Sequence, residues 1–204
     1  MFISVIIPTY NRSKMLHKPV ESFMSQTLDE KLFELIIANN NSTDDTQMVI
    51  DGLVKKYPLR IKSIFVEKQG VHYARNRAVK VAKGELLYFT DDDMIADKNV
   101  LVEFLKIFES DKEGRIATAT GKVLPLWEAE PPEWIKKYCT NGRLSLIDRR
   151  ESFILAHYDV GVYSCHQMLR RNILLQCEGF NPENTAGEWI GDGESGLNIK
   201  IREV

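Results

Sequence analysis

Three consecutive aspartates, Asp91-Asp92-Asp93, are the residues of this 204-residue chain whose type and spacing most directly predict chemistry. Adjacent carboxylates repel one another, and a divalent cation that prefers oxygen ligands offsets that repulsion. An isolated acidic triplet is more often a solvated turn, but this one follows Thr90 and an apolar run at residues 86–89, as a strand end would. We therefore predict that the triplet holds Mn2+ or Mg2+, bridged to the phosphates of a substrate.

Two other polar clusters also follow apolar runs. Pro8-Thr9-Tyr10-Asn11-Arg12 comes after residues 2–7, and Asn39-Asn40-Asn41-Ser42 comes after residues 35–38. Because ligands of an open parallel sheet bind at the carboxyl ends of its strands, the three clusters are expected to meet at one edge. The amides of Asn39 and Asn40 suit hydrogen bonds to a nucleobase, and Tyr10 suits stacking on it. A turn with a helix cap is the alternative for the asparagines, and packing on the next helix is the alternative for Tyr10.

The remaining polar residues give weaker signals. Arg75 is predicted to face a phosphate or to pair with the acidic triplet, with a surface ion pair as the alternative. The histidines lack the spacing of metal ligands, and the cysteines form no CxxC pair, so we predict surface or hydrogen-bonded core histidines and buried reduced thiols. These residues are His17, His72, His157, His166, Cys139, Cys165 and Cys177. Neither GxGxxG nor GxxxxGK[ST] occurs, so dinucleotide and P-loop sites have no support.

The elements that must position these residues alternate between strand and helix. Near-continuous apolar runs at 2–7, 35–38, 61–66 and 86–89 predict strands buried on both faces, as in a parallel sheet. Helical patterns cover residues 15–26, 71–82 and 99–108, and Ser42-Thr43-Asp44-Asp45 predicts the hydroxyl-capped start of another helix. The alternation predicts a doubly wound α/β fold with a mostly parallel, Rossmann-like sheet.

The second half of the chain is less regular. It predicts a strand at 117–124, a short helix after Pro131-Pro132, a loop from Phe180 to Gly196, and a last helix in which the chain ends.

Composition and charge exclude some classes of protein. The chain is 44% hydrophobic and 27% charged with a net charge of −2, which is typical of a soluble globular domain and argues against a nucleic-acid binder. The first ten residues lack the features of a signal peptide, and no apolar run approaches the length of a membrane span. We expect a cytoplasmic protein, with peripheral attachment to the inner face of the membrane left open.

Several motifs together resemble family 2 glycosyltransferases with the GT-A fold. Ser4-Val5-Ile6-Ile7-Pro8-Thr9-Tyr10-Asn11-Arg12 resembles their opening strand, and Glu34-Leu35-Ile36-Ile37-Ala38-Asn39-Asn40-Asn41-Ser42-Thr43-Asp44 resembles their second strand and turn. Ala74-Arg75-Asn76, Lys83-Gly84-Glu85 and Asp91-Asp92-Asp93 resemble the run into their metal-binding DXD motif. The resemblance covers the first half of the chain and resumes at Arg170-Arg171 and Gly179-Phe180.

The resemblance implies transfer of a sugar, with inversion, from a nucleoside-diphosphate sugar, usually UDP-linked, to a glycan or lipid-linked acceptor. It implies one catalytic domain over residues 1–204, with a nucleotide-sugar-binding half at 1–110 and an acceptor-binding half at 111–204 that is cut short at its end. Asp93 and Asp91 would ligate Mn2+ or Mg2+. The nucleotide would be bound by Pro8, Thr9, Tyr10, Arg12, Asn39, Asn40, Arg75, Asp91 and Asp92.

The chain departs from the family at two places. The family often has aspartate where Asn39 and Asn40 stand, and its catalytic Glu-Asp pair is replaced by Gly191-Asp192-Gly193-Glu194. When Leu197 is aligned with the family's leucine, Glu194 aligns with the second acid of that Glu-Asp pair. The resemblance therefore implies Glu194 as the catalytic base and Asp192 as the reserve, whereas the alternative is that both acids merely begin the last helix.

The segment from Pro125 to Trp134 is predicted to contribute to the acceptor site, because aromatic rings pack on the apolar faces of sugars. The alternative is that Trp127 and Trp134 are core anchors. Two other functions were weighed. A metal-dependent nucleotidyltransferase would share the fold, but residues 8–12 do not form the glycine-rich loop with a lysine that is usual there. An inactive glycan-binding module on the same fold is the non-enzymatic alternative.

Overall fold

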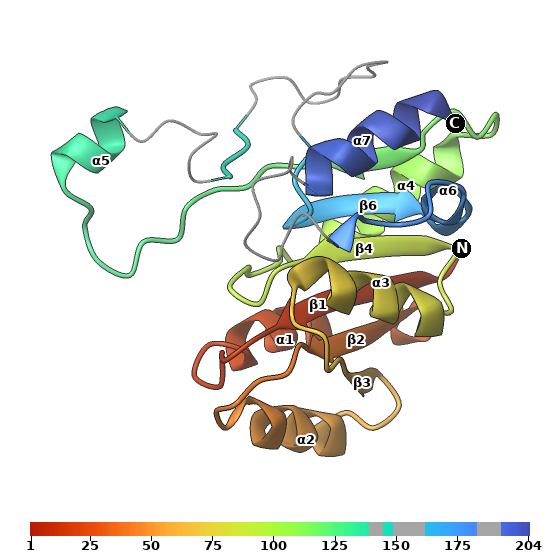
Figure 1. Cartoon of the computed structure of the whole chain (residues 1–204). Helices are drawn as coiled ribbons and strands as arrows, with labels where there is room; N and C mark the ends of the chain where they lie inside the picture. Colours follow the sequence, from red (N-terminus) through yellow and green to blue (C-terminus); the bar gives the residue numbers. More distant parts are fainter. Residues whose placement is uncertain (139–144, 149–161, 183–192) are drawn as a thin grey trace.

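The computed structural model describes residues 1–138, 145–148, 162–182 and 193–204, except for the side chains of residues 193–195 (Figure 1). Within these residues, six strands form one sheet in the order β3-β2-β1-β4-β6-β5. Parallel pairing joins β1 to β2, β2 to β3 and β1 to β4, whereas β6 runs antiparallel to both β4 and β5. The strands are β1 (Ile3–Thr9), β2 (Phe33–Asn39), β3 (Ile61–Phe65), β4 (Leu86–Thr90), β5 (Thr118–Thr120) and β6 (His166–Arg170).

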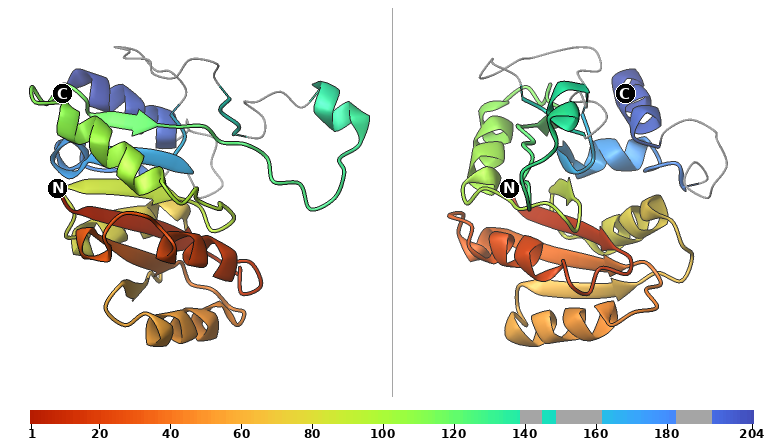
Figure 2. Two further views of the ribbon diagram at one scale, coloured as in Figure 1. Left: turned by 180° about the vertical axis from the view of Figure 1, so that it is seen from behind. Right: turned by 90° about the vertical axis from the view of Figure 1, so that its left-hand side faces the viewer.

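Helices cover both faces of the sheet, which confirms the doubly wound α/β prediction (Figures 1 and 2). Apolar side chains of α1, α2 and α4 pack on one face, and those of α3, α6 and α7 pack on the other. The helices are α1 (His17–Met24), α2 (Thr46–Lys56), α3 (Val71–Val81), α4 (Val100–Ser110), α5 (Glu133–Tyr138), α6 (Arg171–Gln176) and α7 (Gly193–Glu203), with a short 3-10 turn η1 (Glu30–Leu32) before β2.

The central strand β1 is buried along its whole length. Ile3, Val5 and Ile7 face α1, α2 and α4, and Ile6 faces α3, as the alternation of side chains along a strand requires. The strand runs two residues beyond the predicted apolar run, to Thr9, because pairing with β4 ends at Ile6 while pairing with β2 continues past Pro8.

Several local predictions differ from the structure, among them the loop predicted as far as Gly196, because α7 already begins at Gly193. β6 was not predicted, because its apolar residues are preceded by His166 and Gln167, which are buried polar side chains. The predicted strand at 117–124 is reduced to β5, and Val123 forms only an isolated bridge with Ile147. The helix predicted to begin with a hydroxyl cap begins at Thr46, and its N-cap Asp45 makes no side-chain cap hydrogen bond.

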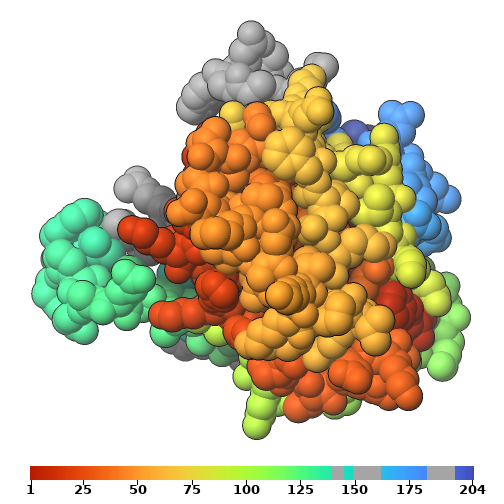
Figure 3. Space-filling model, turned by 90° about the horizontal axis from the view of Figure 1, so that it is seen from below, coloured from red at the N-terminus to blue at the C-terminus, as the bar shows by residue number. Residues whose placement is uncertain are grey.

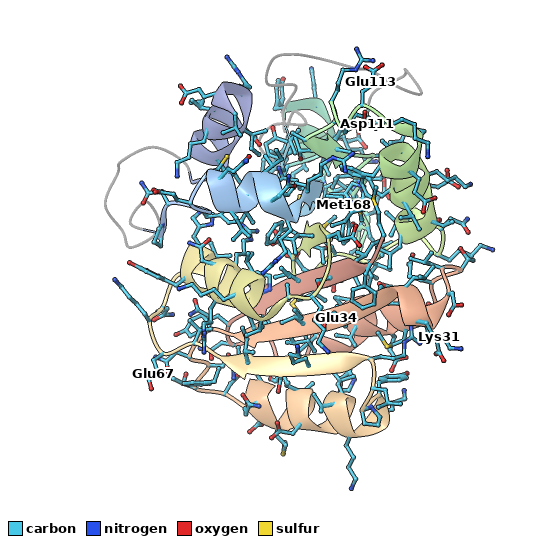
Figure 4. All side chains as sticks on the ribbon, turned by 90° about the vertical axis from the view of Figure 1, so that its right-hand side faces the viewer. Lys31, Glu34, Glu67, Asp111, Glu113 and Met168 are labelled. Carbon is cyan, nitrogen blue, oxygen red and sulfur yellow. The ribbon has the colours of Figure 1, made fainter. Side chains whose placement is uncertain are left out.

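At the edge of the sheet opposite the acidic triplet, two carboxylates accept hydrogen bonds from the segments that connect the strands and helices. Glu34 accepts hydrogen bonds from the Ser4 hydroxyl and the Lys83 amide, both at 2.7 Å. Asp111, after α4, accepts from the Ile116 amide at 2.7 Å and from Arg170 Nη2 at 2.9 Å. Figure 4 shows Glu34 in the body of the molecule and Asp111 at the end of α4.

The strand order reverses beside β1. The chain moves outward from β1 to β2 and β3, and then returns through α3 to place β4 on the other side of β1. Such a reversal leaves a crevice outside the carboxyl ends of the two strands that flank it, and ligands of open α/β sheets bind there. In this chain those two ends carry the polar residues after Thr9 and the aspartates after Thr90.

Residues 124–138, which we call the arm, follow the bridged Val123 and stand away from the sheet with α5 at their tip (Figures 1 and 2). Seen from below, α2 and β3 cover most of the visible face, and the arm projects to one side (Figure 3). Within the described residues, no helix is long and apolar enough to cross a membrane.

Candidate functional site

The acidic triplet lies at the strand-order reversal and is flanked by two arginines. Asp91 accepts a hydrogen bond from Arg75 Nη2 at 2.9 Å. Asp92 is 9% exposed, and its Oδ1 lies 3.7 Å from Arg12 Nε. Asp93 is exposed and has no ion-pair partner among the residues that the structure describes. The triplet therefore combines one buried, one paired and one open carboxylate.

Burial raises the pKa of the Asp92 carboxyl, and the neighbouring carboxylates Asp93 and Asp91 raise it further, while the Arg12 charge opposes them. The protein alone therefore disfavours full ionisation of the triplet. A bound cation would favour the ionised form, because opposite charges at this distance stabilise one another.

Arg75 joins α3 to the triplet. Its side chain is 2% exposed and reaches Asp91 from the first turns of the helix. This confirms the predicted pairing with the acidic triplet, and the alternative of a surface ion pair is wrong because the guanidinium is buried.

Asn39 and Asn40 lie at the end of β2, and their amide groups bond to the chain itself. Asn39 donates to Gln47 Oε1 at 2.7 Å and accepts from the Ser42 amide at 3.0 Å. Asn40 donates to the Lys68 carbonyl at 2.8 Å and accepts from the Gly70 amide at 2.7 Å. The bond to Ser42 is the predicted turn bond and the bond to Gln47 ties that turn to α2, whereas both bonds of Asn40 tie the chain after β3 to the site edge.

The chain after β1 turns back over the start of α2. Asn11 has a φ of 52°, and its Oδ1 accepts from the Thr43 amide at 2.8 Å. The Arg12 amide donates to Thr46 Oγ1 at 2.9 Å. These bonds hold the chain at Asn11 and Arg12, directly after Tyr10, and Tyr10 is left 41% exposed at the site edge.

The two acids of the second half are described only in part. Asp192 lies outside the described residues, and Glu194 lies in α7, where its backbone but not its side chain is described. Leu197, the residue used to align them, is 1% exposed in the core beside α3.

The arm carries exposed aromatic side chains. Trp127 is 44% exposed, Trp134 is 59% exposed and Tyr138 is 60% exposed. The alternative that both tryptophans are core anchors is therefore wrong.

Two residues near the site were not expected from the sequence to matter. His166 is buried, and its Nδ1 lies 2.5 Å from the Tyr88 hydroxyl, which confirms that it is a hydrogen-bonded core residue. Phe180 is 1% exposed and packs on Phe89, two residues before Asp91. A signal for Phe180 was present in the Gly179-Phe180 resemblance, but its packing partners are distant in sequence. Cys165 and Cys177 are buried, as predicted, whereas Cys139 and His157 lie outside the described residues.

Among the described residues, no group of three or more histidine, cysteine or acidic side chains is arranged so that it could hold a metal ion. A cavity of about 360 Å³ lies at the opposite edge of the sheet, next to Lys83, Glu85 and Arg171, and contains none of the predicted site residues.

Known proteins resemble this chain in sequence and structure. The uncharacterized glycosyltransferase YfnE from Bacillus subtilis (strain 168) is 37% identical over 115 residues, which are 55% of this chain and 28% of YfnE. The crystal structure of S. aureus TarS 1-349 in complex with UDP-GlcNAc superposes with a TM-score of 0.68 at 23% identity, covering 98% of this chain and 54% of that one. The mannosyltransferase PcManGT from Pyrobaculum calidifontis, in complex with GDP-Man and Mn2+, gives 0.66 at 17% identity, covering 89% and 48%.

These likenesses confirm the GT-A type of α/β fold. The chain spans about a quarter or less of the length of several curated relatives that it matches. The sequence profile of glycosyl transferase family 2 matches residues 4–177, which is most of the chain. The chain therefore belongs to glycosyl transferase family 2.

Proposed function

We propose that this chain binds a nucleoside-diphosphate sugar at the carboxyl ends of β1 and β4 and transfers the sugar, with inversion, to a hydroxyl of a glycan or lipid-linked acceptor. The observation that carries this proposal is the Asp91-Asp92-Asp93 triplet, flanked by Arg12 and Arg75 at the reversal of strand order. Family membership supports the reaction class.

The nucleotide lies along the end of β1. Tyr10 offers an exposed ring for stacking on the base, and Pro8 and Thr9 form the backbone edge beneath it. Asn39 and Asn40 act by shaping the pocket, because their amides already bond to the chain. Arg12, Arg75, Asp91 and Asp92 surround the ribose and diphosphate. Uridine is the expected base, although structures of this fold are found with UDP-GlcNAc and with GDP-Man, so the base must be tested.

The open carboxylate of Asp93, together with Asp91, fits Mn2+ or Mg2+. Both cations prefer oxygen ligands and are commonly held by one or two carboxylates plus substrate phosphates. When bound, the cation would stabilise the negative charge of the departing nucleoside diphosphate. Arg75 keeps one Asp91 oxygen in a fixed position at 2.9 Å.

Inverting transfer also needs a group that takes the proton of the acceptor hydroxyl. We assign this role to Glu194, with Asp192 as the reserve, from their place beside the buried Leu197. A carboxylate within hydrogen-bond reach of the acceptor can act as this base. The exposed tryptophans of the arm supply apolar surface for the acceptor, and any attachment of the protein to the inner face of the membrane would follow from a lipid-linked acceptor.

Calorimetric titration of UDP and GDP, each with Mn2+ and with EDTA, tests the donor site. We expect UDP to bind in the presence of Mn2+. UDP at a hundred times its Kd should then also raise the free energy of unfolding by about 2.7 kcal/mol. Asp93→Asn should remove most of the gain in UDP affinity that Mn2+ provides. The control Asp51→Asn, which changes an exposed acid on α2, should leave that gain unchanged. Equal affinity with Mn2+ and EDTA would refute the metal, and tighter binding of GDP would overturn uridine.

The reaction products distinguish a sugar transferase from the alternative, a metal-dependent nucleotidyltransferase. A sugar transferase releases a nucleoside diphosphate from the donor, whereas a nucleotidyltransferase makes or consumes pyrophosphate. Nucleotide-sugar incubated with the protein and Mn2+ should yield nucleoside diphosphate without pyrophosphate.

A further inference from the structure

The turn after α6 is hydrogen-bonded to α3 by Asn76, whose partner Phe180 lies 104 residues further along the chain. Asn76 Nδ2 donates to the Phe180 carbonyl at 2.8 Å, and the Phe180 amide donates to Asn76 Oδ1 at 3.0 Å. The side-chain amide thus satisfies both backbone groups of Phe180, as a paired strand would.

The residue before Phe180 is glycine for a reason that the same contact explains. Gly179 has a φ of 77°, and a Cβ built on it would lie 2.6 Å from Asn76 Oδ1. Any side chain here would break the Asn76 contact and strain the backbone. The local sequence is therefore shaped to hold Phe180 in one place.

The Phe180 ring sits between α3 and β4. It stacks on His72, with the ring centroids 5.0 Å apart and the planes within 6°, and it meets Phe89 edge-on at 5.0 Å. The guanidinium carbon of Arg75 lies 5.5 Å from its centroid. One buried ring therefore contacts both the arginine that pairs with Asp91 and β4, the strand that ends one residue before Asp91.

We propose that Phe180 is a positioning residue for the donor site: its ring holds the Arg75 guanidinium on Asp91, and Asn76 holds the ring. This inference rests on the proposed function, because Asp91 is assigned there to the nucleotide and metal. An arginine side chain has many rotamers, and a fixed aromatic face next to a buried guanidinium favours the one that is observed. Phe180, from the second half of the chain, thereby completes the site built by the first.

Titration of UDP with Mn2+ into the full chain tests this role through a double-mutant cycle. Phe180→Leu keeps an apolar side chain and removes the ring, and we expect it to weaken the Kd by about tenfold. Arg75→Lys should weaken binding at least as much, and the double variant should bind no worse than Arg75→Lys alone, because the ring then has no guanidinium to hold. Leu174→Ala, in the same core cluster, should lower Tm and leave Kd unchanged.

Two further measurements keep the test decisive. Asn76→Ala leaves the ring in the chain and removes the two bonds that hold Phe180, so it should also weaken Kd. In the ligand-free protein, the NMR signal of the Arg75 Nε–H group should be sharp in the wild type and broadened or lost in Phe180→Leu.

The inference would be overturned if the double variant weakened the Kd by the product of the two single fold-changes of Phe180→Leu and Arg75→Lys. It would also be overturned if Phe180→Leu and Asn76→Ala both kept the wild-type Kd and the wild-type Arg75 signal. A wild-type chain that binds no UDP with Mn2+, but shows the Arg75 signal change, would refute the proposed function while the contact between ring and arginine stands.

Discussion

The donor edge of the sheet and the arm differ in how their polar and aromatic side chains are held. At the donor edge, Asn39, Asn40, Arg75 and Asp91 bond to other parts of the chain. In the arm, Trp127 and Trp134 are largely exposed and α5 stands apart from the sheet (Figure 2). The proposed donor edge is therefore preorganised by the fold itself, whereas the arm presents exposed aromatic side chains. A change at the donor edge should cost stability, and a change in the arm should alter only what the arm contacts.

Removal of the proposed base should produce the largest effect. Glu194→Gln keeps size and hydrogen bonding but cannot take the acceptor proton, so kcat should fall by about two to four orders of magnitude while the Kd for UDP is unchanged. Initial rates of sugar transfer and calorimetry measure the two quantities. Glu203→Gln, near the other end of α7, is the matched control.

The outcome separates three assignments. If Glu194→Gln keeps the parent rate and Asp192→Asn does not, the base is Asp192. If neither change matters, the base lies elsewhere, and the two acids only begin the helix.

His166, on β6 beside β4, should make the free energy of unfolding depend on pH. Burial lowers the pKa of His166 to about 4 from an ordinary value of 6.5. Between these values the unfolded chain binds a proton that the native protein does not, so stability is full above pH 6.5 and declines as the pH falls toward 4. The loss approaches about 3 kcal/mol.

Urea unfolding at several pH values measures this slope. His166→Gln should flatten it between pH 4 and 6.5, and the exposed His17, changed to Gln, should leave it as in the wild type. An unchanged slope in His166→Gln would show that other groups cause the acid sensitivity.

At the donor edge, loss of one buried amide should be costly. Asn40→Ala leaves the Gly70 amide and the Lys68 carbonyl without their partner, which should lower the free energy of unfolding by about 2–4 kcal/mol. Urea unfolding of the variant beside Asn172→Ala, an exposed asparagine on α6, measures the difference. Equal losses in the two variants would contradict the description of this edge as preorganised.

The arm should give the smallest effect on stability. Trp134→Ala should change the free energy of unfolding by less than about 0.5 kcal/mol, because the ring is mostly exposed. If the ring packs on the acceptor, the acceptor KM should rise by about fivefold with the donor KM unchanged. Leu59→Ala, at a 97% exposed position far along the chain from the arm, should alter neither KM. A large loss of stability in Trp134→Ala would remove the contrast between the two regions.

β1, β2 and β4 were predictable because each is an apolar run that is buried on both faces. For β3 the strand was predicted correctly but its burial was not, because it is an edge strand whose Phe65 is exposed. β6 escaped prediction because His166 and Gln167 find their partners in residues distant in sequence, among them Tyr88 and Thr118. The asparagines after β2 were recognised as polar strand-end residues, but amide chemistry alone does not distinguish a base contact from a turn bond.

The sequence by itself determined the alternation of elements, the acidic triplet at a strand end and the resemblance to the family, because these depend on residues that are close together in the chain. Tertiary structure decided which strand lies beside β1, and hence that the triplet faces Arg12 across the reversal of strand order. It also decided that Phe180 packs against Arg75. Such contacts join residues separated by up to 105 positions, and only the packing of helices on the sheet brings them together.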